Sequence, residues 1–429
     1  MLSEDTKTVL YNMLSKLATL PAEAIRPEMK LFGRDLALDS LSGVELVTWL
    51  EQQFGITLED LDVDLSALDS VGSLLRFING QISERWTGQL EKVAAAARLK
   101  EGRFGVEQVL LHIREHPGAT SRELAAWCSL PTPTIAALRK ELHQAGLVGK
   151  EGKGAFLSPK GEALLETFYP SWAGVSASAP EPYGRARQSP LFAELTERCR
   201  ALLRHRPPAD TQLDQAKCLP ETAAARALLA LENGLLAGRR LAFLGDDDFT
   251  SVAVAVLGDM LAEHQAAGPA AITVLDIDER IVNTLTELAE QHSWPLLAYG
   301  HDLRRPLPAD LLHRHDGFFT DPPYTVTGAR LFVSRGVEMC RPEGFTAFLS
   351  FAPKGPDEML AVQADMARMG LYLREIKPGF NRYEGGSLWG NQSHMLVYSS
   401  TTKARPLLTT NYEGQLYTAE FRQPTLRQR

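Results

Sequence analysis

Residues 240–248, Arg-Leu-Ala-Phe-Leu-Gly-Asp-Asp-Asp, decide the fold class of this chain. The apolar run at 240–244 predicts a short buried strand, and the apolar segment from Phe249 predicts a helix. Rossmann-like folds place a glycine-rich cofactor loop at such a junction. Here the loop holds one glycine and three carboxylates, Gly245, Asp246, Asp247 and Asp248. An anionic loop favours a cationic ligand and disfavours a phosphate or carboxylate group.

Further apolar runs follow along the chain and alternate with amphipathic segments. The expected strands are Leu241–Leu244, Ile272–Asp276, Leu296–Ala298, Gly317–Thr320, Gly344–Ser350, Tyr372–Ile376 and His394–Tyr398. The expected helices begin near Phe249, Glu279, Ala329 and Pro356. This alternation predicts an α/β, doubly wound, Rossmann-like sheet of the methyltransferase type, which binds ligands at the carboxyl ends of its strands.

Acidic residues stand at the carboxyl ends of the next three expected strands. Asp276 and Asp278 close the second strand, Asp302 follows the third, and Asp321 follows the fourth. One aspartate at such a position often only caps the next helix, which is the simpler explanation for Asp278. The whole set is harder to explain in this way, because carboxylates gathered in one crevice repel unless a cation offsets them. We expect Asp276 to hold ribose hydroxyls and Asp302 to reach an adenine amino group.

The motif Asp321-Pro322-Pro323-Tyr324 is more specific than a single aspartate. Its two prolines stiffen the turn, so that the backbone carbonyls face a ligand in a fixed direction. Loops of this kind receive amino groups in N-methyltransferases. Tyr324 can stack on an adjacent planar or cationic group.

Residues of about 185–400 resemble the branched-chain polyamine synthases, which attach aminopropyl groups to an internal nitrogen of spermidine. The matching segments are Asp214-Gln215, Leu-Gly-Asp-Asp-Asp-Phe, Val-Leu-Asp-Ile-Asp-Glu-Arg, Asp302-Leu-Arg and Phe-Thr-Asp-Pro-Pro-Tyr-Thr. The resemblance implies decarboxylated S-adenosylmethionine as the donor and methylthioadenosine as the product. It also implies an essential aspartate in the Gly-Asp-Asp-Asp motif, placed at Asp248, with Asp246 and Asp247 as supporting acids. An acid of this triplet, Asp321 or water would take the proton of the amine.

Two other functions stay open from the sequence. The first is a transferase that uses intact S-adenosylmethionine to move a methyl or aminocarboxypropyl group. An acidic loop argues against it, because that donor carries a carboxylate. The second is a regulator that senses a ligand and carries a winged helix. The acids at the strand ends argue against it, because a sensor needs to grip the ligand but needs no acid beside a reacting amine.

Residues 1–84 predict a small helical bundle and resemble an acyl or peptidyl carrier domain, through Leu-Asp-Ser-Leu, Val-Glu-Leu-Val and Leu-Glu-Gln-Gln-Phe-Gly-Ile. The resemblance implies a 4'-phosphopantetheine arm on Ser40. Asp39 or Ser40 would cap the helix there, and the helix dipole favours an incoming phosphate. The simpler alternatives are that Asp-Ser is only a cap, or that the carrier is unmodified.

The carrier domain implies partners and a tethered substrate. A phosphopantetheinyl transferase and acyl- or aminoacyl-loading enzymes would act on it, and its acidic residues would dock on basic surfaces. Free polyamine synthesis does not need such an arm. The acceptor is therefore either a polyamine or an amine held on the carrier as a thioester, as in secondary metabolism.

The remaining segments divide as follows: 85–102 a connecting helix, 103–170 a winged helix, 171–190 a linker, 191–402 the Rossmann-like domain, and 403–429 a polar tail. The winged helix predicts DNA binding through Arg139, Lys140, Lys150 and Lys153, or protein interaction and homodimerisation. Its basic residues are few, so nucleic acid is not the expected partner.

Residues 377–393 predict a loop with glycines and aromatics before the last strand. Tyr383, Glu384 and Trp389 would cover the acceptor as a lid, or the loop is an ordinary crossover with buried aromatics.

Composition limits the other options. The 429 residues carry a net charge of −8, and residues 1–85, with 14 acidic and 7 basic side chains, supply −7 of it. The four cysteines lack the spacing of a zinc site or a disulfide framework, and we expect no metal. No apolar run is long enough to span a bilayer and no secretory signal is visible, so we expect a cytoplasmic location.

Overall fold

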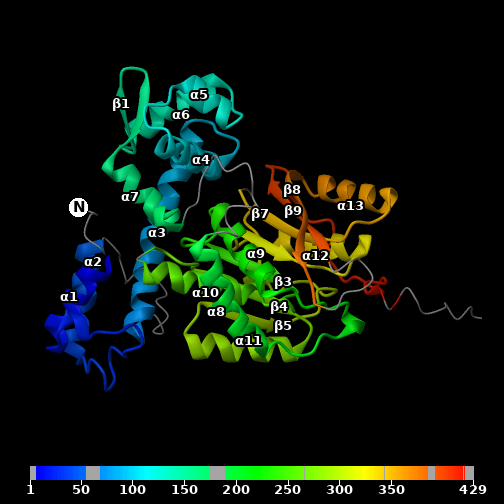
Figure 1. Ribbon diagram of the computed structural model, residues 1–429, viewed down its shortest axis with the longest axis horizontal. Coiled ribbons are helices and arrows are strands. Elements are labelled where there is room, and N and C mark those ends of the chain that lie inside the picture. The colour runs from blue at the N-terminus through cyan, green and yellow to red at the C-terminus, as the bar shows by residue number, and fades with distance from the viewer. Residues whose placement is uncertain are drawn as a thin grey trace, which may run out of the picture. The chain divides into compact units, whose positions relative to one another are not determined.

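The structure is a computed structural model that describes residues 6–54, 68–173, 189–264, 266–342, 344–384, 392–418 and 420. The chain divides into two compact units, Met1–Ser178 with Gly258–Ala270, and Ala179–Leu257 with Ala271–Arg429. Figure 1 shows the helices of the first unit and the sheet of the second. No helix in these ranges combines the length and apolar character that a membrane span requires.

The carrier region of the first unit is a helical bundle. Its elements are α1 (Thr6–Ala18), η1 (Ala22–Ala24), α2 (Ser40–Phe54) and the start of α3 (Val71–Ala96). Apolar side chains at helical spacing meet in a fully buried core, which includes Leu10, Leu14, Leu46, Leu50, Val71, Leu74 and Ile78. The predicted helical carrier fold is confirmed, while the acidic positions Glu59, Asp60, Asp62 and Asp64 lie outside the described residues.

Helix α3 continues beyond the carrier core. It begins at a capping box formed by Ser70 and Ser73, and it contacts α4, α6 and α7 further along. Trp86 and Leu90 are buried in this second half. The sequence predicts a separate connecting helix at 85–102, whereas the structure has one helix of 26 residues that starts in the carrier bundle. Because no proline falls between 71 and 96, nothing interrupts its backbone hydrogen bonds.

The rest of the first unit is a module of helices with one hairpin. Its elements are α4 (Gly102–Glu115), α5 (Ser121–Trp127), α6 (Thr132–Gln144), β1 (Val148–Glu151), β2 (Gly154–Leu157), α7 (Pro159–Phe168) and η3 (Ser171–Ala173). Strands β1 and β2 pair antiparallel. Arg139 donates hydrogen bonds to Ser121 Oγ at 2.7 Å and to the Lys153 carbonyl at 3.1 Å. The guanidinium therefore ties the hairpin tip to two helices, a structural role that the DNA-binding hypothesis does not require.

The second unit is built on a seven-stranded sheet. Its strands are β3 (Arg240–Leu244), β4 (Ala271–Asp276), β5 (Leu296–Gly300), β6 (Gly317–Thr320), β7 (Thr346–Phe351), β8 (Leu371–Arg382) and β9 (Gln392–Ser400). They lie in the order β5-β4-β3-β6-β7-β9-β8. The first five are parallel, and β9 runs antiparallel to both of its neighbours. This is the methyltransferase-like sheet predicted from the sequence, with the switch in strand order between β3 and β6.

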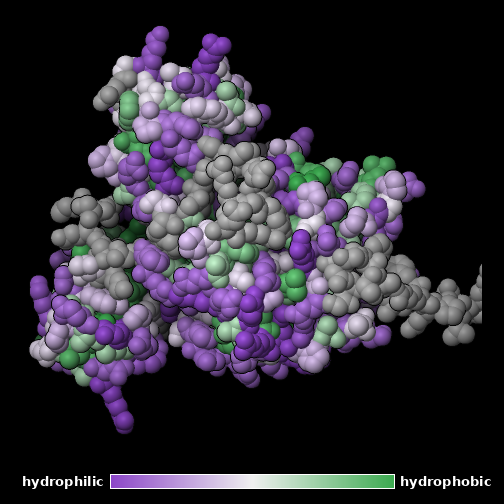
Figure 2. All heavy atoms as spheres, in the orientation of Figure 1, coloured by the Kyte–Doolittle hydropathy of each residue, from purple (hydrophilic) through white to green (hydrophobic). Residues whose placement is uncertain are grey.

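Helices lie on both faces of this sheet (Figure 1). They are α8 (Pro190–Leu202), α9 (Pro220–Glu232), α10 (Thr250–Glu263), α11 (Glu279–His292), α12 (Val326–Met339) and α13 (Pro356–Arg368), with single turns η5 (Leu203–His205), η6 (Thr211–Leu213) and η7 (Ala309–Leu311). In α11 the side chains of Ile281, Leu285 and Leu288 are buried, while the surface over this helix is hydrophilic in Figure 2. This amphipathic pattern is why the sequence predicted the helix start at Glu279 correctly.

Two segments of the second unit differ from the expectations. Strand β8 extends to Arg382, so residues 377–382 are strand and the predicted loop is shorter. The expected tail is also packed in part: Arg335 is fully buried and donates to the carbonyls of Leu408 and Thr410, at 3.2 and 2.8 Å. A buried guanidinium needs such acceptors, and it fixes the segment after β9 to the sheet domain.

Candidate active site

A pocket opens at the carboxyl ends of β3 to β6, with a volume of about 530 Å³ that includes space open to solvent. It is lined by Leu213, Asp214, Gln215, Gly245, Asp247, Leu275, Asp276, Ile277, His301, Asp302, Leu303, Asp321, Pro323, Phe332, Leu416 and Tyr417. Five of these side chains are aspartates, and none of the described lining residues is a lysine or arginine. The pocket thus brings together Gly245, Asp247, Asp276, Asp302, Asp321 and Pro323 of the predicted site.

Asp246 is buried beside the pocket and caps helix α10. Its carboxylate accepts hydrogen bonds from the amides of Thr250, at 2.8 Å, and Ser251, and from the Ser251 hydroxyl at 2.5 Å. Burial raises the pKa of this carboxyl to about 8. Asp246 was predicted as a catalytic acid, and its contacts in the structure are those of a cap at the start of α10.

Asp276 holds the loop that follows β3 in place through hydrogen bonds. Its Oδ2 accepts the amide of Asp246 and its Oδ1 accepts the amide of Asp278, both at 2.9 Å. Gly245 precedes this contact with φ of +71°, a conformation that favours glycine. A Cβ at this position would meet the Phe332 ring at 3.3 Å. The loop conformation therefore depends on one glycine and one carboxylate.

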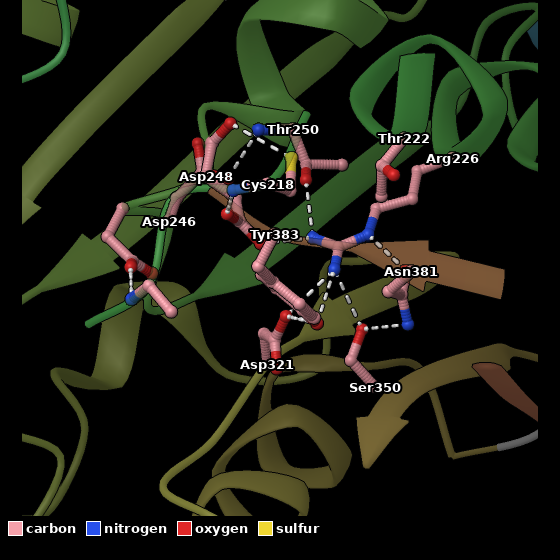
Figure 3. Close-up of polar contacts among 12 residues, drawn as sticks. Cys218, Thr222, Arg226, Asp246, Asp248, Thr250, Asp321, Ser350, Asn381 and Tyr383 are labelled. Atoms are coloured by element: carbon pink, nitrogen blue, oxygen red, sulfur yellow. Dashed lines mark hydrogen bonds and ion pairs between the residues drawn. The ribbon is translucent and has the colours of Figure 1, made fainter. Parts of the chain in front are cut away.

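Asp248 is paired with a buried cation that the sequence interpretation did not include. Arg226, on helix α9, is 3 % exposed and donates from Nη1 to Asp248 Oδ2 at 2.7 Å. The Cys218 amide also donates to this carboxylate. Figure 3 shows the guanidinium held between Asp248 and Asp321, with its Nε directed to Asn381.

Asp321 receives the other half of the Arg226 fork. Its Oδ2 accepts Arg226 Nη2 at 2.8 Å and the Tyr383 hydroxyl at 2.6 Å. Burial raises the pKa of Asp321 to about 6, although Arg226 opposes this rise. The Tyr324 hydroxyl donates to the Tyr383 oxygen at 2.9 Å, and its ring packs edge-on against Phe351. Tyr324 is therefore engaged with protein groups. It was predicted to contact the ligand, but it is not among the residues that line the large pocket.

Asp247 lines the large pocket. Its Oδ2 accepts the amide of Ala216 at 2.9 Å. Burial raises the pKa of this carboxyl well above its usual range, and the nearby carboxylates of Asp248, Asp321 and Asp276 raise it further. Such a group gains most from a cationic ligand, because the cation offsets both causes of the shift.

Asp278 and Asp302 have different positions. Asp278 caps α11, pairs with Arg280 Nη2 at 2.6 Å, and does not line the pocket; the Arg280 contact lowers its pKa to about 2. It was predicted to bind the cofactor or, more simply, to cap the next helix, and its contacts in the structure are those of a cap. Asp302 lines the pocket, and its Oδ1 accepts the amide of Arg304 at 3.0 Å.

The region predicted as a lid is only partly described. Tyr383 is 7 % exposed and belongs to the Arg226 and Asp321 network, as a crossover with buried aromatics predicts. The Glu384 carboxylate accepts Arg206 Nη2 at 3.3 Å. Trp389 lies outside the described residues. Pro322 is buried and does not line the pocket, whereas Pro323 does.

Two segments far apart in the chain close one side of the pocket. Leu213 and Asp214 come from the turn before α9, and Leu416 and Tyr417 come from the C-terminal segment. The Thr418 amide donates to Asp214 at 2.7 Å and joins the two. No periodic pattern of apolar residues indicated the C-terminal contribution. Arg226 did leave a signal, because it is the one charged residue between Thr222 and Leu231 in an otherwise Ala- and Leu-rich helix.

Ser40 is exposed at the start of α2 in the carrier bundle. The cap is supplied by Asp39, whose Oδ1 accepts the Ser42 amide at 2.7 Å. This bond lowers the pKa of Asp39. The serine hydroxyl is therefore not needed as the cap, and it stands where the helix dipole favours a phosphate group.

Comparison with known proteins follows the division into two units. The profile of the branched-chain polyamine synthase A C-terminal domain matches residues 194–420, just over half of the chain. The chain belongs to the branched-chain polyamine synthase family. The N(4)-bis(aminopropyl)spermidine synthase of Thermococcus kodakarensis is 32 % identical, over 61 % of this chain and 72 % of the relative. The synthase of the same name from Methanocaldococcus jannaschii is 28 % identical, over 74 % of this chain and 87 % of the relative. The protein is thus a transferase of the aminopropyltransferase class.

One further profile extends this assignment, and one solved structure is similar to the chain. The phosphopantetheine attachment site profile matches residues 8–78, so this member of the family also carries a phosphopantetheine attachment domain. A crystal structure of the branched-chain polyamine synthase from Thermus thermophilus, in complex with N4-aminopropylspermidine and 5'-methylthioadenosine, aligns with a TM-score of 0.49 and 26 % identity, covering 79 % of this chain and 98 % of that chain. The family assignment rests on the sequence relatives.

Proposed function

We propose that the protein transfers an aminopropyl group from decarboxylated S-adenosylmethionine to an amine and releases methylthioadenosine. The observation that carries this proposal is the pocket with five aspartates and no lysine or arginine among its described lining residues. The donor is a sulfonium with an ammonium group, and the acceptor is a polycation or an amine. A wall of carboxylates is complementary to both.

The same wall disfavours the intact donor. S-adenosylmethionine differs by one carboxylate, which would lie in the field of Asp247 and Asp321. One pair of unit charges about 4 Å apart interacts by about 4 kcal/mol at an effective dielectric constant of 20, before desolvation. That is ample to separate the two donors, so methyl and aminocarboxypropyl transfer are the less favoured reactions.

The reaction forms one C–N bond and breaks one C–S bond. The lone pair of the acceptor nitrogen attacks the methylene carbon bound to the sulfonium, and the sulfur keeps the bonding pair as the neutral thioether. The nitrogen loses one proton, which we assign to Asp321. Its pKa of about 6 leaves it ionised at neutral pH yet more basic than an ordinary carboxylate. Asp247 would orient the amine in line with the carbon and the sulfur.

The neighbouring residues act on the bound groups and on Asp321. Asp276 and Asp302 line the pocket where ribose and adenine would lie. Arg226 and Asp248 hold the Asp321 carboxylate in place. We therefore propose Asp248 as a positioning residue, although the family resemblance singles it out as essential.

A carrier-bound acceptor is the second candidate. It is favoured by the phosphopantetheine attachment domain and by the exposed position of Ser40 at the start of α2. Leu41 and Val44 are 77 % and 63 % exposed on the same helix and give an apolar surface for partner enzymes. On this hypothesis the arm on Ser40 holds an aminoacyl group, and the amine of that group receives the aminopropyl unit.

The test uses the full chain after treatment with a broad phosphopantetheinyl transferase. Each donor is incubated with spermidine alone, or with the protein loaded with an aminoacyl group. Small-molecule products and intact protein mass are then measured. We expect methylthioadenosine and an aminopropyl gain only with the decarboxylated donor. A gain on spermidine supports the free acceptor, and a gain on the loaded protein supports the carrier-bound one.

Three variants make the test specific. Asp321→Asn should lower kcat strongly, whereas Asp248→Asn should shift the acid limb of the pH profile because Asp248 acts through Arg226. Ser40→Ala should remove only the carrier-bound activity. Methyl transfer from S-adenosylmethionine at a comparable rate would refute the proposed donor.

A further inference from the structure

A second group of side chains able to hold a ligand lies at the end of α4, in the first unit. His112, Glu115 and His116 each offer one ligand atom, and these atoms all lie within 4.8 Å of one another. His112 and Glu115 lie in the last turn of α4, where the spacing i, i+3 puts them on one face, and His116 is the C-cap residue that follows.

His112 is the residue that points to a ligand. It is 5 % exposed, and its Nδ1 is buried without a hydrogen-bond partner. A buried polar atom of this kind normally has a protein, water or metal partner.

The surroundings also favour a cation. Trp127, at the end of α5, stacks on the His112 ring with a centroid distance of 5.7 Å, and it contacts the His116 ring in a tilted arrangement at 4.5 Å. The indole restrains both imidazoles in one orientation. The cluster lies at the C-terminal end of a helix of 14 residues, where the helix dipole is negative.

We propose that His112, Glu115 and His116 form a site for a divalent transition metal ion of the Zn²⁺ class. Two imidazole nitrogens and one carboxylate oxygen suit Zn²⁺, Ni²⁺ or Co²⁺, and they suit Mg²⁺ and Ca²⁺ poorly. Water would complete the coordination sphere. The site belongs to the helical module of the first unit, and its ion would stabilise the end of α4 and its contact with α5.

The experiment uses the untagged full-length chain after treatment with a chelator. Zn²⁺ binding is measured by titration calorimetry, and Co²⁺ or Ni²⁺ binding by tryptophan fluorescence. We expect one equivalent of metal, with quenching that disappears in Trp127→Phe while Zn²⁺ binding remains. Mg²⁺ should cause neither effect.

Variants at the less buried ligands avoid dependence on the packing of His112. Glu115→Gln should weaken Zn²⁺ binding by at least tenfold, and His116→Ala should abolish it. His205→Ala, an exposed histidine of the other unit, is the matched control and should bind as the wild type does. Circular dichroism verifies that each variant is folded. The proposal is overturned if the wild-type protein shows no saturable Zn²⁺ binding. It is also overturned if the Glu115 and His116 variants bind Zn²⁺ as tightly as the wild type does.

Discussion

Replacing Arg226 with methionine removes the cation that joins Asp248 to Asp321. The methionine keeps most of the side-chain volume in a position that is 3 % exposed, so the main change is electrostatic. The guanidinium lies 2.7 Å from one carboxylate and 2.8 Å from the other. Both carboxylates would remain buried without this partner.

The size of the effect follows from how a buried carboxylate responds. Breaking a buried ion pair costs about 3–5 kcal/mol, and this arginine serves two carboxylates. A stranded carboxyl can instead take up a proton, which costs about 1.4 kcal/mol for each pH unit above its solution pKa. For Asp321, with an ordinary value of 3.8, that route costs about 5 kcal/mol at pH 7.5 and about 2 kcal/mol at pH 5.5. We therefore expect Arg226→Met to lower the free energy of unfolding by about 4 kcal/mol at pH 7.5 and by about half as much at pH 5.5.

The variant should become less stable as the pH rises. The folded variant would hold its protons at a higher pKa than the unfolded chain does, so raising the pH from 5.5 to 7.5 favours unfolding. Because the chain has two units, a single urea transition is not a safe measure of stability. Thiol labelling of Cys218 reports the opening of this site directly, since this cysteine is fully buried and its amide donates to Asp248.

The matched control is Arg200→Met on α8. Arg200 pairs with Glu197 and Glu221, but its side chain is 41 % exposed, so the loss should stay within about 1 kcal/mol. The reasoning would be refuted if Arg226→Met cost less than about 1 kcal/mol at pH 7.5. A deficit that grew at pH 5.5 would refute it as well. Adding Asp248→Asn to Arg226→Met should restore part of the lost stability.

Four more results are expected. Asp246→Ala should lower the stability by about 1–2 kcal/mol, because two α10 amides lose their acceptor. Asp246→Asn should lower it less in the same Cys218 labelling assay, and equal losses would argue against the cap. Spermidine affinity, measured by calorimetry, should fall as the pH falls from 7.5 to 5.5, because Asp321, with a pKa raised to about 6, takes up a proton in that window; a flat profile would contradict this. The hydrogen bond from Tyr383 lowers the pKa of Asp321, so Tyr383→Phe should raise that pKa and move the acid limb of the rate profile to higher pH. An unmoved limb would count against that contact. Ser40→Ala should gain no phosphopantetheine mass with a broad transferase, and a retained gain would place the arm elsewhere.

The sheet could be predicted because its signal is local. Each buried strand is an apolar run of four to six residues, and the helix at Glu279 has an apolar face at helical spacing. The acids at the strand ends followed from the topology, since parallel strands end at the same edge of the sheet. Asp247, Asp276, Asp302 and Asp321 do lie around one pocket.

The individual roles of the acids could not be predicted, because they depend on partners that are distant in the chain. Arg226 lies 22 residues from Asp248 and 95 from Asp321, and no periodic pattern encodes either contact. The three consecutive aspartates look equivalent in the sequence. In the structure one caps a helix, one faces the pocket and one holds the arginine.

The pocket wall from Leu416 and Tyr417 was missed for a related reason. These residues follow the last strand without a helix or strand of their own. Their position depends on acceptors for a fully buried arginine, Arg335, and on the bond from Thr418 to Asp214. Such tertiary contacts leave no mark in hydrophobic periodicity.

Helix α3 gives the carrier bundle an unusual thermodynamic property. Val71 and Leu74 belong to the carrier core, and Trp86 and Leu90 are buried further along the same unbroken helix. With a rise of 1.5 Å per residue, its 26 residues form a rod of about 39 Å. Helix formation is cooperative, so local unfolding at either end of α3 destabilises the turns that follow it. The two cores should therefore open as one cooperative foldon, and amide hydrogens along the whole helix should exchange with one common protection factor.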